Sequence, residues 1–283
     1  MQVDRAQIEH FLDIAIAEDI GEGDHTSLAT LEPDQQGKAI LIAKQDGILA
    51  GVKIAEIVFH KINSQLKFHT FKKDGEAIYN GDKIFEVRGN AIAILMAERL
   101  ALNIVQRLSG IATQTREYVK KIEGLPTKIL DTRKTTPGMR LLDKYAVKVG
   151  GGTNHRIGLY DMILIKDNHI DFAGGIEIAI DRVHRYLQQK NLSLKIEIEA
   201  RSLEDVQRIL KKGGVHCVLL DNFTPQQTRE AVAMINGKFE TESSGNITLQ
   251  NVREYAECGV DYISIGALTH QIRSLDFSLK VSE

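Results

Sequence analysis

Basic side chains that could bind anions are concentrated in one segment of this 283-residue chain. The segment reads DTRKTTPGMRLLDKYAVKVGGGTNHR, from Asp131 to Arg156, and holds six Lys or Arg, one His and only two acids. Guanidinium and ammonium groups are suited to binding carboxylates and phosphates. The segment therefore predicts a site for an anionic ligand, and Lys166 in the strand-like run MILIKD adds a further cation to it.

The chain as a whole has no excess of positive charge. It carries 36 Lys and Arg against 38 Asp and Glu, which gives a net charge of -2. Without a global positive field, neither nucleic acid nor an anionic membrane surface is expected as a partner. The anion site must therefore be local to the basic segment.

The cations of the basic segment fall into two groups by position. Arg140, Lys144 and Lys148 recur at helical spacing and are predicted to form one solvated helix face. The others leave a strand end or follow the GGGTN loop, and these are predicted to converge on the ligand: Arg133, Lys134, His155 and Arg156.

Carboxylates follow the later strand-like runs, with Glu199, Asp221 and Glu242 at three successive strand ends. The first two could bind a divalent cation, accept hydrogen bonds from sugar hydroxyls, or stabilise a developing positive charge. Ion pairing with Lys166 or Arg133 is a compatible alternative. Taken together, the polar strand ends predict one shared binding mouth.

Two loops near the C-terminus have the residues of a phosphate site. ESSGNITLQNV passes from a strand end through Ser244, Gly245 and Asn246 towards a predicted helix, and ISIGALTH does the same through Gly266 and Ala267. Small residues, free backbone N–H groups and a helix N-terminus favour phosphate binding. In α/β barrels such sites are often built by the last two strand-to-helix loops.

Six strand-like runs alternate with helical patterns from Pro126 onwards: KILDT, MILIKD, LKIEIEA, VHCVLLDN, KFETES and VDYISIG. The last four strand ends, at Glu199, Asp221, Glu242 and Gly266, lie 22, 21 and 24 residues apart. This spacing predicts parallel strands joined by helical crossovers. The periodicity leaves open whether the sheet curls into a barrel or forms a doubly wound layer, but about 155 residues is well short of the roughly 250 of an eight-stranded barrel. A barrel here would be incomplete.

The first hundred residues have a different rhythm. An amphipathic helix at the N-terminus is followed by the strand-like runs KAILIAK, LKFHTF and KIFEVR, interrupted by the helical stretch GVKIAEIVFHKIN. A long helical pattern, AIAILMAERLALNIVQRLSG, then leads into the second half. We predict an α/β protein with domains at 1–112 and 113–267, and a tail at 268–283 that packs with the first domain.

The two cysteines, Cys217 and Cys258, fit no metal-ligand spacing and are predicted to be buried core residues in a reducing compartment. The N-terminus has no basic region of a signal peptide, and no apolar run approaches the roughly 20 residues needed to cross a bilayer. A cytoplasmic location is therefore expected.

Eight motifs, between about residues 18 and 270, resemble in order those of the quinolinate phosphoribosyltransferase family: EDIGEGDHTS, AERLALNIVQRLSGIAT, the basic segment, DMILIKDNH, EIEA, LLDN, ESSGN and ISIGALTH. The resemblance implies a pentosyltransferase that transfers phosphoribose from 5-phosphoribosyl-1-pyrophosphate to quinolinate, with loss of pyrophosphate and CO2. The product would be nicotinate mononucleotide, in NAD biosynthesis. It also implies Mg2+ without an organic cofactor, an N-terminal α/β sandwich, a C-terminal incomplete α/β barrel of about six parallel strands, and a homodimer or larger assembly.

The same resemblance implies roles for individual residues. Quinolinate would be held by Arg133, His155, Arg156 and Lys166, with Arg99 reaching it from the partner subunit. Lys134 would contact the pyrophosphate donor beside Thr132, and Glu199 and Asp221 would bind the ribose hydroxyls and Mg2+. Phosphate would be held by Ser244, Gly245, Asn246, Gly266 and Ala267. Lys134, Glu199 and Asp221 would act in catalysis, by stabilising the leaving group and the sugar cation.

Two positions depart from the family's pattern. Asn246 stands where many relatives have a second glycine, so a backbone contact there would be replaced by a side-chain contact. His25 stands where relatives often have an aliphatic residue, and no function is assigned to it.

Three alternatives share the same residues. Lys166 at a strand end could form an imine in a Schiff-base lyase. The scaffold could also serve a non-catalytic phosphate-binding protein, although carboxylates such as Glu199 and Asp221 repel phosphates. A third possibility is a phosphoribosyltransferase acting on another ring acid, such as nicotinate.

Overall fold

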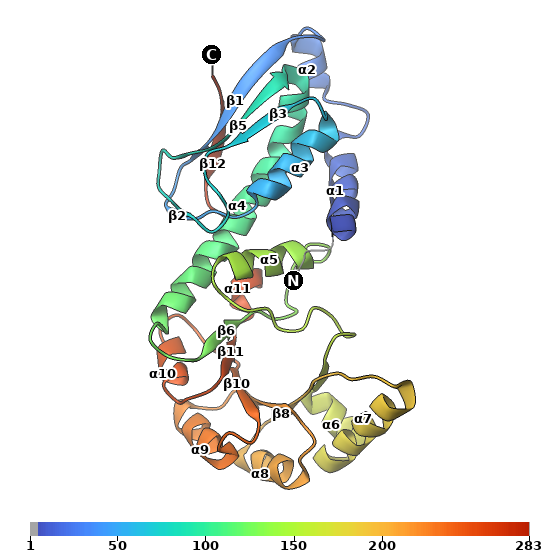
Figure 1. Ribbon diagram of the computed structural model, residues 1–283, viewed down its shortest axis with the longest axis vertical. Helices are drawn as coiled ribbons and strands as arrows, with labels where there is room; N and C mark the ends of the chain where they lie inside the picture. Colours follow the sequence, from blue (N-terminus) through green and yellow to red (C-terminus); the bar gives the residue numbers. More distant parts are fainter. Residues whose placement is uncertain (1–4, 283) are drawn as a thin grey trace. The chain divides into compact units, whose positions relative to one another are not determined.

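A computed structural model describes residues 5–282 of the chain, which divides into two compact units (Figure 1). The first unit runs to Arg116 and also contains Thr135–Gly151 and the chain from Ala267 onwards. The second unit comprises Glu117–Lys134 and Gly152–Gly266. Residues 135–151, which lie inside the predicted second domain, are grouped with the first unit.

The first unit is built on an antiparallel sheet with the strand order β12-β1-β5-β3. Its strands are β1 (Gln36–Ala43), β3 (Lys67–Thr70), β5 (Lys83–Asn90) and β12 (Phe277–Val281), and a separate pair is formed by β2 (Gly47–Ile48) and β4 (Ala77–Ile78). The C-terminal strand β12 pairs with β1, so the end of the chain returns to the first sheet.

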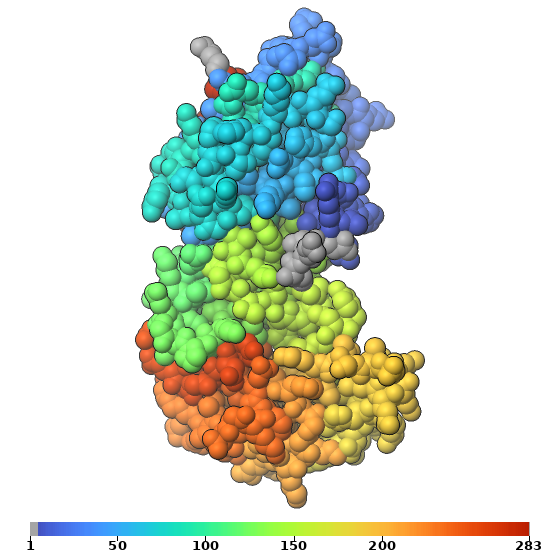
Figure 2. Space-filling view, viewed as in Figure 1, coloured from blue at the N-terminus to red at the C-terminus, as the bar shows by residue number. Residues whose placement is uncertain are grey.

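The helices of this unit are α1 (Arg5–Ile20), α2 (His25–Thr30), α3 (Val52–Ile62) and the first part of α4 (Ala91–Lys121). Helix α3 packs on the sheet through Phe59, whose ring centroid lies 5.9 Å from that of Phe85 in β5. Helix α1 lies on the outside of the unit and buries only Ile8 and Leu12 (Figure 2, dark blue).

The basic segment contributes helix α5 (Arg140–Val149) to the first unit, together with the short helix α11 (Ala267–His270). The prediction of one solvated face for Arg140, Lys144 and Lys148 is wrong. Lys148 is exposed, Arg140 is half-buried, and Lys144 is fully buried within α5.

A buried ion pair holds α5 in place. Arg107 of α4 donates from Nε and Nη2 to the two carboxylate oxygens of Asp143, each at 2.9 Å. The same Asp143 accepts the main-chain N–H of Thr136 at 3.1 Å, and Arg107 also donates to the Thr136 hydroxyl at 2.8 Å. These bonds explain why residues 135–151 group with α4 rather than with the strands that flank them.

The second unit contains a six-stranded parallel sheet in the order β6-β11-β10-β9-β8-β7. The strands are β6 (Lys128–Leu130), β7 (Ile163–Ile165), β8 (Ile196–Ala200), β9 (Cys217–Asp221), β10 (Glu240–Ser244) and β11 (Tyr262–Ser264). All six coincide with predicted runs. Strands β6 and β7 are the two edges and do not pair, so the predicted incomplete barrel of about six parallel strands is confirmed.

The crossovers are α6 (Asp167–Ala173) with α7 (Ile176–Lys190), then α8 (Leu203–Lys212), α9 (Pro225–Ile235) and α10 (Val252–Ala256), which lie around the outside of the sheet (Figure 1). Ser202 caps α8, accepting from the Asp205 N–H at 3.1 Å, and Thr224 and Gln227 form a capping box at α9.

Both cysteines are buried and unpaired, as predicted. Among residues 5–282, no helix combines the length and the apolar character that crossing a membrane requires.

Candidate active site

The carboxyl ends of the six parallel strands lie at one edge of the second unit's sheet, because strands of the same direction end on the same side. Most of the predicted site residues are at or directly after these ends: Thr132, Arg133, Lys134, Lys166, Glu199, Asp221, Ser244, Gly245, Asn246 and Gly266. His155 and Arg156 belong to the same unit, in the segment that follows the GGG run. Arg99, exposed on α4, and Ala267, the first residue of α11, belong to the first unit.

Lys166 and Glu199 form an ion pair at this edge. Lys166 Nζ lies 3.2 Å from Glu199 Oε1, and Glu199 Oε2 accepts the main-chain N–H of Asp167 at 3.0 Å. Both oxygens of Glu199 are therefore engaged. The ion pair between neighbouring strand ends is the one that the sequence left open as an alternative.

Two arginines lie close together without full compensation. The Nε of Arg133 is buried and has no hydrogen-bond partner among residues 5–282. Burial lowers the pKa of Arg156, the nearby charge of Arg133 lowers it further, and Glu197, Asp161 and Glu199 only partly offset these effects. A pair of cations in this state has unused capacity to bind an anion.

Two asparagines link the loops after β9 and β10. Asn246 donates from Nδ2 to Asn222 Oδ1 at 3.0 Å, and Asn222 donates from its own Nδ2 to Asp221 Oδ2 at 2.9 Å. Both asparagines are left-handed, with φ of 55° for Asn246 and 57° for Asn222. Asn246 thus adopts the conformation that favours glycine, and adds a side-chain bond that a glycine cannot make.

Gly245 must be a glycine where the two loops meet. Its φ is 90°, and a Cβ atom there would lie 2.2 Å from Asn222 Oδ1. The sequence also predicted that this loop leads towards a helix, and a helix does follow, but it starts later than predicted. Helix α10 begins only at Val252 and is five residues long, because Thr248 and Asn251 close a turn before it. Any phosphate contact here must come from the loop itself.

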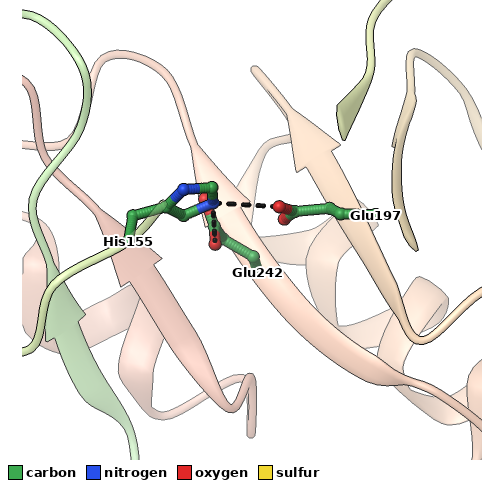
Figure 3. A group of neighbouring side chains, drawn as sticks. All are labelled: His155, Glu197 and Glu242. Carbon is green, nitrogen blue, oxygen red and sulfur yellow. Dashed lines mark hydrogen bonds and ion pairs between the residues drawn. The ribbon is translucent and has the colours of Figure 1, made fainter. Parts of the chain in front are cut away.

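A buried cluster lies inside the sheet, formed by His155, Glu197 of β8 and Glu242 of β10 (Figure 3). His155 Nε2 lies 2.9 Å from Glu197 Oε2 and 3.5 Å from Glu242 Oε2. Both glutamate side chains are 2% exposed. On the other side of the ring, the main-chain N–H of Arg156 donates to His155 Nδ1 at 2.7 Å. Both ring nitrogens are therefore engaged within the second unit.

The three side chains of this cluster share protons as one unit. Burial lowers the pKa of His155, but hydrogen bonds and charge from Glu197 and Glu242 outweigh it and raise the pKa to about 10. Burial, with the charge of Glu197, raises the pKa of Glu242 to about 7. The raised pKa of Glu242 lets this carboxyl group take the proton from the ring, and Nδ1 of the neutral ring then accepts the Arg156 N–H, which an imidazolium ring cannot do.

Glu197 and Glu242 were not predicted as site residues. Glu242 was predicted only as one of the polar strand ends of the shared mouth, yet it lies within β10 and is buried. The signal was present in IEIEA and ETESS, where acids alternate with other residues along a strand. Since alternate residues share a face, Glu197 lies on the same face as Glu199, and Glu242 on the same face as Ser244.

Comparisons with known proteins identify the family. The model of the quinolinate phosphoribosyl transferase C-terminal domain matches residues 111–280, and that of the N-terminal domain matches residues 24–109. A quinolinate phosphoribosyltransferase [decarboxylating] of Nicotiana glauca is 44% identical over 289 residues, covering 97% of this chain and 82% of its own length. A probable nicotinate-nucleotide pyrophosphorylase [carboxylating] of Bacillus subtilis is 41% identical, covering 98% of this chain and 94% of its own length.

A solved structure agrees with these matches. The crystal structure of NadC from Streptococcus pyogenes superposes with a TM-score of 0.94 at 37% identity, covering 100% of this chain and 99% of that one. The resemblance drawn from the eight motifs is confirmed, because both domain models match and the fold agrees over the full length of the chain. With a six-stranded incomplete barrel, cations and carboxylates at its strand ends, and relatives above 40% identity, the chain belongs to the quinolinate phosphoribosyltransferase family.

Proposed function

We propose that the protein transfers phosphoribose from 5-phosphoribosyl-1-pyrophosphate to the ring nitrogen of quinolinate, giving nicotinate mononucleotide, pyrophosphate and CO2 in NAD biosynthesis. Besides the family, the proposal rests on one observation, the charge of two arginines in the site. Arg133 and Arg156 are close enough to interact, and they lack full compensation beside a row of polar strand ends. A ligand with two carboxylates supplies the missing negative charge.

The chemistry needs charge and positioning more than a nucleophilic side chain. Loss of pyrophosphate from the anomeric carbon gives a transition state resembling an oxocarbenium ion, so the leaving group and the sugar cation both need stabilisation. Lys134 is assigned to the leaving pyrophosphate, and Glu199 and Asp221 to the ribose. The pyridine nitrogen is itself the nucleophile, so no general base is required, and positioning supplies much of the rate.

Decarboxylation follows from the first step. Once the ring nitrogen carries the ribose it is positively charged, and the electron pair left by CO2 at the neighbouring ring carbon is stabilised by that charge. The protein needs only to hold the carboxylate in place, which we assign to Arg133, Arg156 and Lys166. His155 completes the set of residues that the family resemblance implies.

The residues present fit Mg2+ delivered with the phosphoribosyl donor. Mg2+ is usually held by one or two carboxylates together with substrate phosphates and water. Asp221 is half-buried at the end of β9, where its Oδ2 accepts a hydrogen bond from the Asn222 side chain. Glu199, on the adjacent strand, would have to exchange its ion pair with Lys166 for a bond to Mg2+. When bound, Mg2+ would neutralise charge developing on pyrophosphate, with Asp221 and Glu199 as its protein ligands.

The assembly is proposed from the family resemblance. We propose a homodimer or larger homo-oligomer in which Arg99 of one subunit reaches quinolinate bound to its partner. An exposed arginine on α4 is available for such a contact. We propose a cytoplasmic location, because unpaired thiols are typical of a reducing compartment.

The Schiff-base alternative gains no support from the geometry. Lys166 is paired with Glu199 at 3.2 Å, and an ion-paired ammonium is a poor nucleophile, whereas imine formation needs the neutral amine.

One assay tests the proposed function. The purified protein, with Mg2+ and 5-phosphoribosyl-1-pyrophosphate, is expected to convert quinolinate to nicotinate mononucleotide and to release one CO2 for each product formed. Nicotinate, which lacks the second carboxylate, should be a poor acceptor because it leaves one cation unpaired. Preference for nicotinate, or product without CO2, would contradict the proposal.

The asparagine link predicts a substrate-specific effect. Asn222→Gly keeps the left-handed backbone but removes the bonds to Asp221 and Asn246, so the KM for phosphoribosyl pyrophosphate should rise by roughly fivefold, the equivalent of about 1 kcal/mol for one net hydrogen bond. The KM for quinolinate should change little. The matched control is Asn236→Gly, which removes another left-handed asparagine, at φ 45°, from the end of α9. Equal effects of both variants would show that the link has no role in donor binding.

A further inference from the structure

The segment that carries Arg156 is irregular and needs to be fixed by side chains. Residues 152–156 contact the sheet's main chain through one bridge, between Leu130 and Thr153. Beyond Thr153, the segment is held by hydrogen bonds to side chains. Asp131, which is fully buried after β6, accepts the main-chain N–H of His155 at 2.9 Å and the side-chain amide of Asn154 at 2.6 Å.

A second set of contacts holds the ring of His155. Glu197 and Glu242 contact Nε2 of the His155 ring from two strands, and Nδ1 of the ring accepts the N–H of Arg156. The side chain of Arg156 in turn donates from Nη1 to the carbonyl oxygen of Met162 at 3.3 Å. A continuous chain of contacts therefore runs from two buried carboxylates, through one imidazole ring, to the main chain of an active-site arginine.

Stability alone gives a poor reason for the two glutamates. The interior of an α/β barrel is normally filled by branched apolar side chains. Here each glutamate buries an Oε1 that has no hydrogen-bond partner among residues 5–282, which is energetically unfavourable. Well-packed apolar residues at buried ionic positions are often as stable or more so. A requirement other than packing explains two carboxylates at this depth.

We propose that Glu197 and Glu242 are positioning residues of the quinolinate site, which hold the His155 ring so that the ring holds the main chain at Arg156. In this assignment His155 contributes to quinolinate binding by fixing the main chain at Arg156. The proposal deepens the role suggested for His155 by family resemblance, and it rests on the proposed function. Glu197, at 2.9 Å from Nε2, has the larger share and Glu242, at 3.5 Å, the smaller.

The test compares two replacements of Glu197 that differ in one property. Glu197→Leu removes the acceptor but keeps most of the volume, whereas Glu197→Gln keeps an acceptor oxygen. We expect Glu197→Leu to raise the KM for quinolinate by about ten- to a hundredfold, the scale of loss when a substrate-holding group is misplaced. Glu197→Gln should fall between Glu197→Leu and the wild type. The KM for phosphoribosyl pyrophosphate should stay within about twofold in both variants.

A control variant separates this role from a general loss of charge. Glu240→Gln alters the same strand as Glu242, two residues earlier, where the side chain is 40% exposed and lies 3.5 Å from Lys195. It should leave both KM values unchanged. Circular dichroism and thermal unfolding report whether each variant is folded. If Glu197→Leu does not fold, Glu242→Leu and Glu197→Gln replace it in the test. Each should raise the KM for quinolinate by less than Glu197→Leu would, and leave the KM for phosphoribosyl pyrophosphate unchanged.

A double-mutant cycle tests whether the glutamate acts through the ring. In a His155→Ala background, Glu197→Leu should cause no further rise in the KM for quinolinate, because the contact that transmits its effect is already lost. Additive effects, an unchanged KM in Glu197→Leu, or equal rises for both substrates would each overturn the positioning role. Failure of the wild type to make nicotinate mononucleotide would instead remove the proposed function, and this inference with it.

Discussion

Replacing Arg133 by alanine is expected to cause a severe loss of quinolinate turnover while leaving the chain folded. Removing one partner of a desolvated charge pair typically costs about 2 to 5 kcal/mol. At the transition state this corresponds to a loss in kcat/KM of about 30- to 5,000-fold. Arg133 is suited to such a role because its Nε is buried without a hydrogen-bond partner among the described residues, so its binding capacity is unused in the free protein.

The same variant should not destabilise the fold. Arg133 acts on Arg156 only by repulsion, lowering the pKa of that guanidinium together with burial. Its removal should therefore leave the unfolding temperature unchanged or raise it. Steady-state kinetics and thermal unfolding, measured on the same preparation, check both halves of the prediction.

Arg208→Ala is the matched control for Arg133→Ala. Arg208 pairs with Glu177 between α8 and α7, and the two side chains are 41% and 44% exposed. Exposed pairs contribute about 0 to 1 kcal/mol, so this variant should keep wild-type kinetics. Wild-type activity in Arg133→Ala, or loss of activity in both variants, would rule out the assigned role of Arg133.

Asp143→Ala is expected to produce the largest loss of stability. Asp143 is fully buried, receives both Nε and Nη2 of Arg107, and accepts the N–H of Thr136. Without it, Arg107 would remain as a poorly compensated charge, with neutral partners in the Thr136 hydroxyl and the Thr269 carbonyl. Breaking a buried pair from one side costs about 3 to 5 kcal/mol. Denaturant unfolding, followed by circular dichroism, measures the loss.

Two further variants show whether the buried charge is the cause. Asp13→Ala removes an acid that is 62% exposed and paired with Lys61 in the same unit, and it should change stability by no more than about 1 kcal/mol. Arg107→Met combined with Asp143→Leu removes both charges, so it should recover much of the stability lost in Asp143→Ala. A double variant as unstable as Asp143→Ala would point to packing around α5 instead.

The second unit was predictable from the sequence to a large extent. Each unit of one buried parallel strand and one helix has a similar length, so the strand ends recur at regular intervals. The intervals of 22, 21 and 24 residues between Glu199, Asp221, Glu242 and Gly266 show this repeat. The ends of such strands meet at one edge, so residues such as Arg133, Lys166 and Asp221 could be grouped without coordinates. Local signals are also present at α8 and α9, where Ser202 and Thr224, residues that favour the N-cap position, cap the helices.

Other predictions failed because the decisive contacts are not local. Helical spacing placed Lys144 on a solvated face, but Lys144 is completely buried in the structure. Turn chemistry likewise displaced the start of α10 from the ESSGN loop to Val252. Glu242 was predicted at the open mouth of the sheet, whereas it lies within β10, is buried, and contacts His155.

The sequence by itself determined the class of fold, the strand ends that carry the chemistry, and the family, because periodicity and short motifs are properties of adjacent residues. The tertiary structure decided which distant residues act together. The bond between Arg107 and Asp143 spans 36 positions and assigns residues 135–151 to the first unit. The contact between His155 and Glu197 spans 42 positions and turns an ordinary strand acid into a buried support for Arg156. Such pairs form only when several elements close around one place, and no local pattern records which side chains will meet there.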